Sequence, residues 1–404
     1  MLLILAWKNI WRNKKRSLII LVAMIFGLWG GLMAGALMMG MGESIVNSAI
    51  DRDLAHIQIH HNAYPIEKEM TNIIPDGPSV VAEIRNIAGV KAVSGRTLIE
   101  GMAASPASSF GVTIVGIIPD EAKQTTNLPE KIIAGDYFES DRKNPIVIGQ
   151  KLATRLNLKL NSKIVLSFQG LDVSFISVAC RVVGIFKTES ALFDEMNVFV
   201  LQGDLFRVLE TTPIIHEIAV RTTSVKIMPQ VAEMLKTKYD TLLVQTWREI
   251  APEIAVVSVM MIYSSYVFVG IILLALLFGI TNTMLMSVVD RIRELGMLIA
   301  VGMKKRYVFA MILLETIFLS ITGGLGGMAI SGVSIRYFSL TGIDFSAFAS
   351  GFESFGASAM VYPFLPVAMY IILTLMIIAT ANIAALLPAW KAIHIQPSEA
   401  IRTY

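Results

Sequence analysis

Few residues of this sequence have the types and spacing that catalysis or metal binding requires. Cys180 is the one cysteine, so the chain can form neither an internal disulfide nor a cysteine-based metal site. The adjacent histidines His60 and His61 lack an i,i+4 partner and a nearby acidic cluster, and we expect them at the surface or at the end of a strand. The sequence holds no Gly-x-Ser-x-Gly, His-Glu-x-x-His or Cys-x-x-Cys motif. We therefore predict no catalytic residue, no metal site and no enzymatic activity for this chain.

Glu315 is a carboxylate inside an otherwise apolar stretch, residues 307–335. An acid within a membrane is costly and usually faces protein or a water-filled cavity. Two roles are open: a step of a proton relay, or a structural bond to a neighbour such as Asn282 or an Arg or Lys near the inner interface. The apolar stretches hold no second acid or histidine that could continue a relay. We favour the structural role and expect Glu315→Gln to reduce assembly or coupling more than any pH dependence.

Residues 290–306 combine charge, glycine and apolar side chains between two apolar runs. The charged residues can form charge-assisted contacts with a protein partner, and glycine permits a close backbone approach or a turn. The methionine and leucine side chains offer an apolar knob. The accumulation of Lys and Arg beside membrane segments explains only the charges. We therefore predict a docking segment formed by Arg291, Arg293, Glu294, Gly296, Met297, Leu298, Gly302 and Met303.

Four apolar stretches are long enough to hold these residues in a membrane. Hydrophobic residues make up 54% of the 404-residue chain and charged residues only 16%, below the roughly 25% that soluble domains carry. A helix needs about 20 apolar residues to cross some 30 Å of hydrocarbon. We predict transmembrane helices at 17–42, 256–289, 307–335 and 360–387, the last opening with Pro363 and Pro366.

Basic residues flank these helices unevenly. They precede the first helix without any acid and recur in the 290–306 segment. Because Lys and Arg accumulate on the cytoplasmic side, we predict a multi-pass protein of the inner (plasma) membrane with both termini in the cytoplasm and the large domain in the periplasm. A cleaved signal peptide would have a shorter apolar run, so we interpret the first helix as an uncleaved anchor. Residues 1–16 have the pattern of an interfacial amphipathic helix, with one apolar face made of Leu3, Trp7, Ile10 and Trp11.

Small residues recur every four positions in two of the predicted helices. This spacing lets helices approach closely. It would serve either a dimer seam or sliding surface, or packing within the chain, and both interpretations stay open. The helix-packing residues are Gly27, Gly31, Gly35, Gly323 and Gly327.

The 43–255 region has the patterns of an α+β domain. Alternating, β-branched runs predict strands, and apolar residues at helical spacing predict three helices. The predicted strands are 55–60, 93–100, 111–117, 145–148, 163–168, 173–185 and 197–201, and the predicted helices are 80–88, 150–156 and 225–239.

Three segments expected in the cytoplasm resemble the FtsX-like permease family of ABC transporters, which includes MacB and the lipoprotein-releasing permeases LolC and LolE. The most specific block is Arg-x-x-Glu-Leu-Gly-x-Leu-x-Ala-x-Gly at 291–302, and the flanking matches are 6–17 and 387–402. Softer matches at 146–153 and 183–200 are similar to the MacB-like periplasmic core. The resemblance covers nearly the whole chain, from the basic N-terminus through one helix and the outer domain to three further helices.

The resemblance implies a fold class and an order of segments. The fold is membrane α-helical, with four transmembrane helices and a large α+β extracytoplasmic domain inserted between helices one and two. The order is an interfacial helix (1–16), helix one (17–42), the outer domain (43–255), helix two (256–289), the coupling segment (290–306), helix three (307–335), a short outer loop (336–359), helix four (360–387) and a cytoplasmic tail (388–404).

The resemblance also implies partners. The coupling segment would dock on an ABC ATPase subunit, and a second permease subunit, identical or paralogous, would complete a dimer. The sequence holds no Gly-x-x-x-x-Gly-Lys-[Ser/Thr] loop, so we expect no cofactor on this chain, with ATP and Mg bound by the separate ATPase as in Lol-type systems. Membrane lipid and a periplasmic lipoprotein carrier or outer-membrane channel are further expected partners. The net charge of +3 and the absence of a basic stripe argue against nucleic acid.

Three functions fit this assembly. Lipoprotein release from the inner membrane is the first prediction. Efflux of macrolides, peptides or other amphiphiles is the second, and signalling to a cell-wall hydrolase is the third, disfavoured because the outer domains of such relatives are shorter. A membrane-bound enzyme would need a catalytic constellation, and the sequence offers none.

Overall fold

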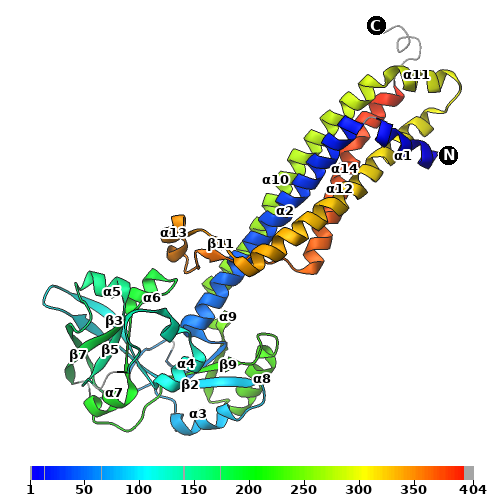
Figure 1. Ribbon diagram of the computed structural model, residues 1–404. Coiled ribbons are helices and arrows are strands. Elements are labelled where there is room, and N and C mark those ends of the chain that lie inside the picture. Colours follow the sequence, from blue (N-terminus) through cyan, green and yellow to red (C-terminus); the bar gives the residue numbers. More distant parts are fainter. Residues whose placement is uncertain (1, 13, 65, 140–141, 173, 395–404) are drawn as a thin grey trace. The chain divides into compact units, whose positions relative to one another are not determined.

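The computed structural model describes residues 2–12, 14–64, 66–139, 142–172 and 174–394 (Figure 1). The chain divides into two compact units. The membrane unit comprises the chain up to 42, residues 258–344 and the chain from 360 on, and the outer unit comprises 43–257 and 345–359.

Four helices of the described chain are long and apolar enough to cross a membrane, as the sequence predicted. They are α2 (Lys14–Ala49), α10 (Pro252–Asp290), α12 (Lys305–Thr341) and α14 (Val367–Ile393). Each is longer than the roughly 20 residues that a span requires.

The predicted bounds of the fourth helix were wrong, and the third predicted span, 307–335, lies inside a longer helix. Helix α12 continues to Thr341 and stops at Gly342, whose φ of +73° suits glycine alone. Helix α14 begins after Pro366, because Met360–Val361 form strand β12 against β11 (Ile343–Asp344), and Pro363 therefore precedes the helix. Helix α14 also passes through the buried Pro388 to Ile393, beyond the predicted end at 387. Residues 395–404 of the predicted tail lie outside the described residues.

The small residues of α2 and α12 contact neighbouring helices of the same chain. A Cβ atom at Gly27 would lie 2.6 Å from Leu276 of α10, and one at Gly327 would lie 2.9 Å from Leu28 of α2. Gly31 faces Ile272, Gly35 faces Leu373, and Gly323 faces Met24. These positions provide close packing within the membrane unit, while a dimer seam stays a prediction.

The N-terminal helix α1 (Leu2–Arg12) packs on α12, where the Trp7 ring meets Phe318 edge to face at 5.5 Å. The residues of its predicted apolar face differ in their exposure. Ile10 is buried in the core of the helix bundle, whereas Leu3 and Trp7 are exposed, as an interfacial helix requires. The side chain of Trp11 lies outside the described set.

The outer unit has two lobes that share the long strand β2 (Val90–Ala104). In lobe A, strand β1 (Ile57–His61) pairs antiparallel with β9 (Glu217–Thr222) and β10 (Leu242–Thr246), and residues 90–96 of β2 pair with β9. Helices α3 (Gly77–Arg85), α8 (Met228–Lys238) and α9 (Trp247–Ile250) complete this lobe. Its core includes Ile57, Ile218 and Leu235.

Lobe B is a closed barrel of six strands. The ring runs from the second half of β2 through β3 (Ser109–Ile117), β8 (Asn197–Leu201), β5 (Pro145–Gly149), β7 (Phe175–Phe186) and β6 (Lys163–Gln169) back to β2. The β3–β8 and β5–β7 pairs are parallel. Strand β4 (Ile132–Gly135) pairs with β7. The interior holds apolar residues such as Ile114, Phe168 and Val198.

Short helices cover the outside of lobe B. They are α4 (Pro119–Thr125), η2 (Leu128–Lys131), α5 (Gln150–Arg155), α6 (Ala191–Met196) and α7 (Gln202–Leu209). A second apolar cluster lies outside the barrel, where Phe186, Phe193 and Phe199 meet Tyr137 and Leu128. The mixture of helices and strands confirms the α+β prediction.

The spanning helices α2 and α10 end inside the core of lobe A. Helix α2 continues into a π-helical turn, η1 (Ile50–Leu54), and its residues Ala49, Ile50 and Leu54 are buried among the core side chains. Ala251 and Ile254, at the start of α10, join the same cluster. The residues at these two helix ends therefore belong to the lobe A core.

Part of the predicted short outer loop belongs to the outer unit. Residues 345–359 form η3 (Ser346–Phe348) and α13 (Ala349–Ser354), and Glu353 pairs with Lys187 of lobe B at 3.0 Å. The sequence showed no signal for this contact, because a six-residue helix has too few turns to display periodicity.

The histidine pair lies at the end of strand β1, as expected, but His60 is not at the surface. Its side chain is buried, with Nδ1 3.2 Å from the carbonyl oxygen of His216 and its ring stacked on Tyr64. A residue near a strand end is buried here because β9 and β10 flank β1 on both sides.

Two other buried histidines predict a pH dependence of stability. The Nδ1 atoms of His56 and His216 accept hydrogen bonds from the backbone N–H groups of Thr222 (3.0 Å) and Leu98 (3.2 Å), so both rings must be neutral. Burial lowers the pKa of both below 6.5. The unfolded chain therefore binds protons first as the pH falls below about 6.5, and stability is lost by up to ~1.4 kcal/mol per pH unit for each histidine.

We expect the melting temperature of the full-length protein to fall between pH 7.5 and 6.0, and to fall less for His216→Asn. The exposed His394 provides the matched control, since His394→Asn should keep the wild-type slope. Asp194 acts in the opposite direction, because burial raises its pKa to about 6 and the folded state gains a proton below that pH. Equal slopes for wild type and His216→Asn would contradict the assignment.

Candidate functional site

The predicted docking segment contains a short helix, α11 (Ile292–Ala300), between two long spanning helices. Gly302 follows the end of the helix by two residues, and its φ of +103° strongly favours glycine. No atom of another residue would lie within 4 Å of a Cβ at this position. Gly302 therefore reverses the chain direction toward α12. The sequence predicted either a close backbone approach or a turn at glycine, and at Gly302 the structure shows the turn.

An apolar patch on and just after α11 is exposed. We define this knob as Met297, Leu298 and Val301, which are 61%, 36% and 85% exposed. Leu295 and Gly296 are buried on the opposite side. Met303, predicted as part of the docking segment, is partly buried against the core of the helix bundle, and its docking role stays a prediction. Val301 was missed, although its place after Ala300 in the sequence block could have suggested it.

A chain of ion pairs joins α11 to two other helices. Arg12 of α1 pairs with Glu294, and Arg291 pairs with both Glu294 (3.2 Å) and Glu315 of α12 (3.1 Å to each carboxylate oxygen). The Arg291 and Glu315 side chains are only 12% and 9% exposed. Burial raises the pKa of Glu294, but hydrogen bonds from Arg12 and Arg291 outweigh it and hold the pKa below its ordinary value. Glu315 thus has the basic neighbour that the structural interpretation expected. Arg293 lies on α11, and its side chain is exposed.

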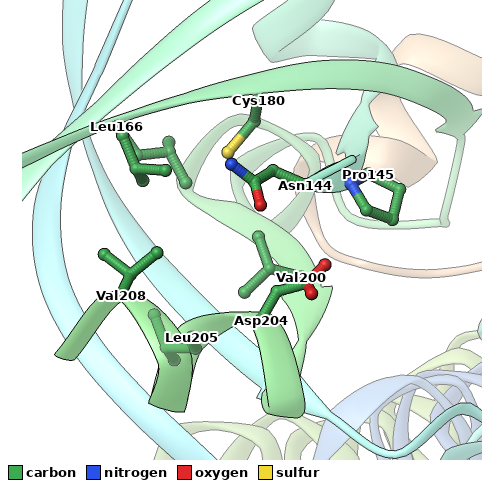
Figure 2. Close-up of a pocket in the computed structure, with 9 residues that line it drawn as sticks. Asn144, Pro145, Leu166, Cys180, Val200, Asp204, Leu205 and Val208 are labelled. Atoms are coloured by element: carbon green, nitrogen blue, oxygen red, sulfur yellow. The ribbon is translucent and has the colours of Figure 1, made fainter. Parts of the chain in front are cut away.

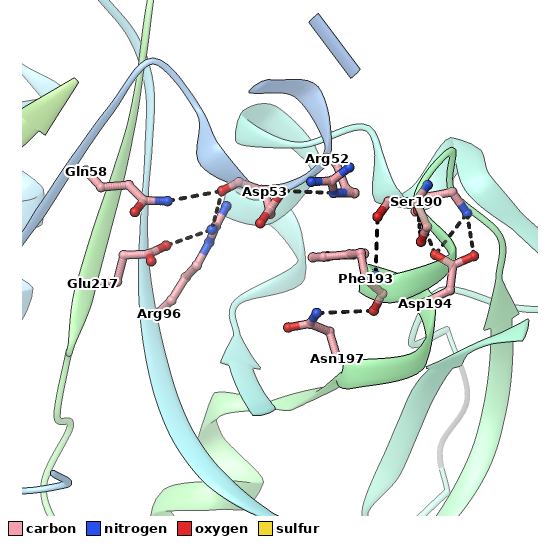
Figure 3. A network of polar contacts seen from close by, with 10 residues as sticks. Arg52, Asp53, Gln58, Arg96, Ser190, Phe193, Asp194, Asn197 and Glu217 are labelled. Atoms are coloured by element: carbon pink, nitrogen blue, oxygen red, sulfur yellow. Dashed lines mark hydrogen bonds and ion pairs between the residues drawn. The ribbon is translucent and has the colours of Figure 1, made fainter. Parts of the chain in front are cut away.

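The end of α2 leads into a second polar cluster, the stalk junction, made of Asp51, Arg52 and Asp53 in the π-helical turn η1. Figure 3 shows Arg52 and Asp53. Asp51 pairs with Arg221 of lobe A, and its carbonyl oxygen accepts from the Asn127 amide. Arg52 lies over the Phe193 ring of lobe B, 4.9 Å from its centroid. The turn is therefore held by side chains of both lobes.

Arg96 completes the junction from strand β2. Its Nη1 atom donates to the Asp53 carbonyl oxygen at 2.6 Å and to Glu217 Oε1 at 2.7 Å (Figure 3). Sequence reasoning missed these residues. The available signal was the charged run 51–53 placed directly after an apolar helix.

The cavity beneath α7 offers no substrate site (Figure 2). Its volume is about 20 Å³, room for roughly one water molecule. Leu166, Val200 and Leu205 line it together with Cys180. Burial raises the pKa of the Cys180 thiol to about 12, so the nucleophilic thiolate is not formed at neutral pH.

Comparison with known families decides the identity of the chain. The FtsX-like permease C-terminal model matches residues 266–397, and the MacB-like periplasmic core domain model matches 17–238, more than half of the 404 residues. The chain is an ABC transporter permease of the MacB/FtsX type. This permease is 24% identical over 347 residues to the uncharacterized ABC transporter permease YknZ of Bacillus subtilis, which covers 81% of this chain and 84% of that relative.

A second relative is similar only in part. The macrolide export ATP-binding/permease protein MacB 2 of Aeromonas hydrophila is 37% identical over 87 residues, which are 20% of this permease and 13% of that protein. Among solved structures, the extracellular domain of YknZ aligns over 47% of this chain and 99% of that domain (TM-score 0.33, 15% identity). The periplasmic region of MacB from Actinobacillus actinomycetemcomitans aligns over 52% of this chain and 97% of that region (TM-score 0.36, 13% identity).

Proposed function

We propose that this permease couples ATP hydrolysis on a separate ATPase subunit to movement of its outer domain. The observation that carries the proposal is the exposed apolar knob on α11, fixed by Arg291 to the buried Glu315 of α12. An apolar patch that none of the described residues covers is typical of a docking site. Under this proposal the patch fills a groove on the ATPase.

Contacts between neighbouring helices support a route for the proposed movement. Helix α11 is joined to α1 through Arg12 and Glu294, and to α12 through Arg291 and Glu315. Helix α10 leads into α11, and its other end lies in the core of lobe A together with the end of α2. Because packed helices shift as rigid elements, a displacement of α11 would reach the outer domain.

The same proposal implies a membrane topology and a set of partners. Both termini and α11 would face the cytoplasm, and the outer unit would face the periplasm. ATP and Mg would bind the partner ATPase, and a second permease subunit would complete the transporter.

Crosslinking tests the docking surface. A photoreactive residue at Met297 is expected to crosslink in native membranes to a nucleotide-hydrolysing protein, identified by mass spectrometry. Met286 of α10, which is similarly exposed but lies within a predicted span, is the matched control and should yield no such product. The proposal fails if Met297 is labelled from the periplasmic side or never reaches an ATPase.

For the cargo we propose lipoprotein release from the inner membrane, and export of an amphiphile is the second candidate. The partial similarity to a macrolide export protein favours the second candidate. Two experiments distinguish these candidates, one with vesicles that hold the complete complex and one with a deletion strain. ATP-dependent release of a lipoprotein supports the first, whereas drug sensitivity of a deletion strain with normal lipoprotein sorting supports the second.

A further inference from the structure

A cavity of about 180 Å³ lies where lobes A and B meet around the stalk junction. Its lining includes Arg52 and Asp53 of η1, Arg96 and Glu217 of lobe A, and Tyr137 and Phe193 of lobe B. Figure 3 shows most of this polar wall. The proposed ATPase coupling assigns no role to this cavity.

Arg96 brings an incompletely satisfied guanidinium group to this cavity. Its side chain is 7% exposed, and Nη1 makes both of the hydrogen bonds described above. Nη2 is buried and has no hydrogen-bond partner among the described residues. A buried donor left unpaired costs about 1–3 kcal/mol, and more when it is charged.

Tyr137 supplies a second unpaired donor. The residue is 7% exposed, and its hydroxyl group has no hydrogen-bond partner within the described parts of the chain. Burial raises the pKa of Tyr137 although the Arg96 charge lowers it, so the hydroxyl keeps its proton and can donate. Two lining side chains of one cavity, one from each lobe, therefore lack acceptors.

The charges and the unpaired donors of the lining indicate the kind of acceptor. Arg52, Lys68 and Arg96 outnumber Asp53 and Glu217. Because Lys68 pairs with Glu100 outside the lining at 3.7 Å, the net charge decides little, and it is the two unpaired donors that favour an anion over a cation. The volume lies below the roughly 300–1,000 Å³ of sites for drug-sized ligands, so the space excludes a macrolide or a lipid chain.

We propose that this cavity binds a small oxyanion, a carboxylate or a phosphate, which accepts hydrogen bonds from Arg96 Nη2 and Tyr137 Oη. Arg96 is the last residue of β2 that pairs with lobe A, and Thr97 is the first that pairs with β3 of lobe B. The bound anion links the two lobes at the point where they share a strand. The proposal concerns the outer domain alone and does not depend on ATPase coupling.

Tyr137→Phe tests the proposal because it removes only the hydroxyl oxygen. Calorimetry and thermal unfolding of the full-length protein in nanodiscs would use acetate and inorganic phosphate, each against chloride at equal ionic strength. At least one oxyanion is expected to raise the melting temperature, with binding at least tenfold weaker in Tyr137→Phe. Without added oxyanion, the variant should be as stable as wild type or slightly more stable.

Tyr239→Phe is the matched control, since the Tyr239 hydroxyl donates to Glu83 and the residue lies outside the cavity lining. It should bind like wild type. A response to acetate alone assigns a carboxylate ligand, and a response to phosphate alone assigns a phosphate. The proposal is overturned if neither oxyanion stabilises the protein beyond chloride, or if Tyr137→Phe binds with wild-type affinity; a trapped water would then occupy the space.

Discussion

Val301→Glu is expected to abolish productive association of this permease with its ATPase. Val301 is the most exposed residue of the apolar knob, at 85%. A carboxylate placed in an apolar groove would be buried without a partner, which costs about 2–5 kcal/mol and weakens binding at least about 30-fold. The measurement is co-purification of the ATPase from detergent-solubilised membranes, together with the permease-stimulated rate of ATP hydrolysis.

Val225→Glu controls for the substitution itself, because Val225 is an exposed valine of the outer unit, 47% exposed. This control should retain the ATPase at the wild-type level. Should Val301→Glu retain it as well, the knob would not be the docking surface, and the proposed coupling would lose its main support.

Arg291→Ala is expected to destabilise the membrane unit severely. The substitution leaves the Glu315 carboxylate, 9% exposed, without the guanidinium that donates to both of its oxygens. Removing one partner of a buried ion pair typically costs about 3–5 kcal/mol. Thermal unfolding and the yield of folded protein in detergent are the two measurements.

The double variant Arg291→Ala/Glu315→Gln should recover part of this loss, because it also removes the buried carboxylate charge that Arg291 balances. Arg336→Ala, at an exposed position of α12, should stay close to wild type. Glu315→Gln alone is expected to impair assembly or coupling more than any pH dependence. A proton-driven activity lost in Glu315→Gln while assembly stays intact would instead assign Glu315 to a relay.

The sequence predicted the parts of the fold that repeat a simple pattern. The spanning helices are long and nearly free of charge, so their number and approximate places could be predicted, whereas their ends depended on local events such as the β11–β12 pairing. Strands β9 and β10 were missed, although both belong to lobe A. Strand β10 is only half-buried over most of its length, so its alternation is weak, and β9 is buried almost throughout, so it shows no alternation at all.

The candidate sites also differed in how far they could be recognised from the sequence. The 291–303 segment stands out in the sequence because its glycine, charged and apolar residues lie close together in the chain, and its docking role stays a prediction. The stalk junction could not be predicted, because Arg52, Arg96 and Phe193 come together only through the pairing of distant strands. Met303 shows the remaining difficulty: a methionine beside an exposed knob can face either way, and only its packing against the bundle decided its place.

The ion pair between Lys187 and Glu353 makes lobe B depend on a segment from far along the chain. The backbone passes between the two units four times, after residues 42, 257, 344 and 359. Two of these crossings, in α2 and α10, lead into lobe A, while the segment between the other two bonds to lobe B. The outer unit is therefore assembled from two separate stretches of the chain, and residues 43–257 expressed alone would lack the segment that bonds to Lys187.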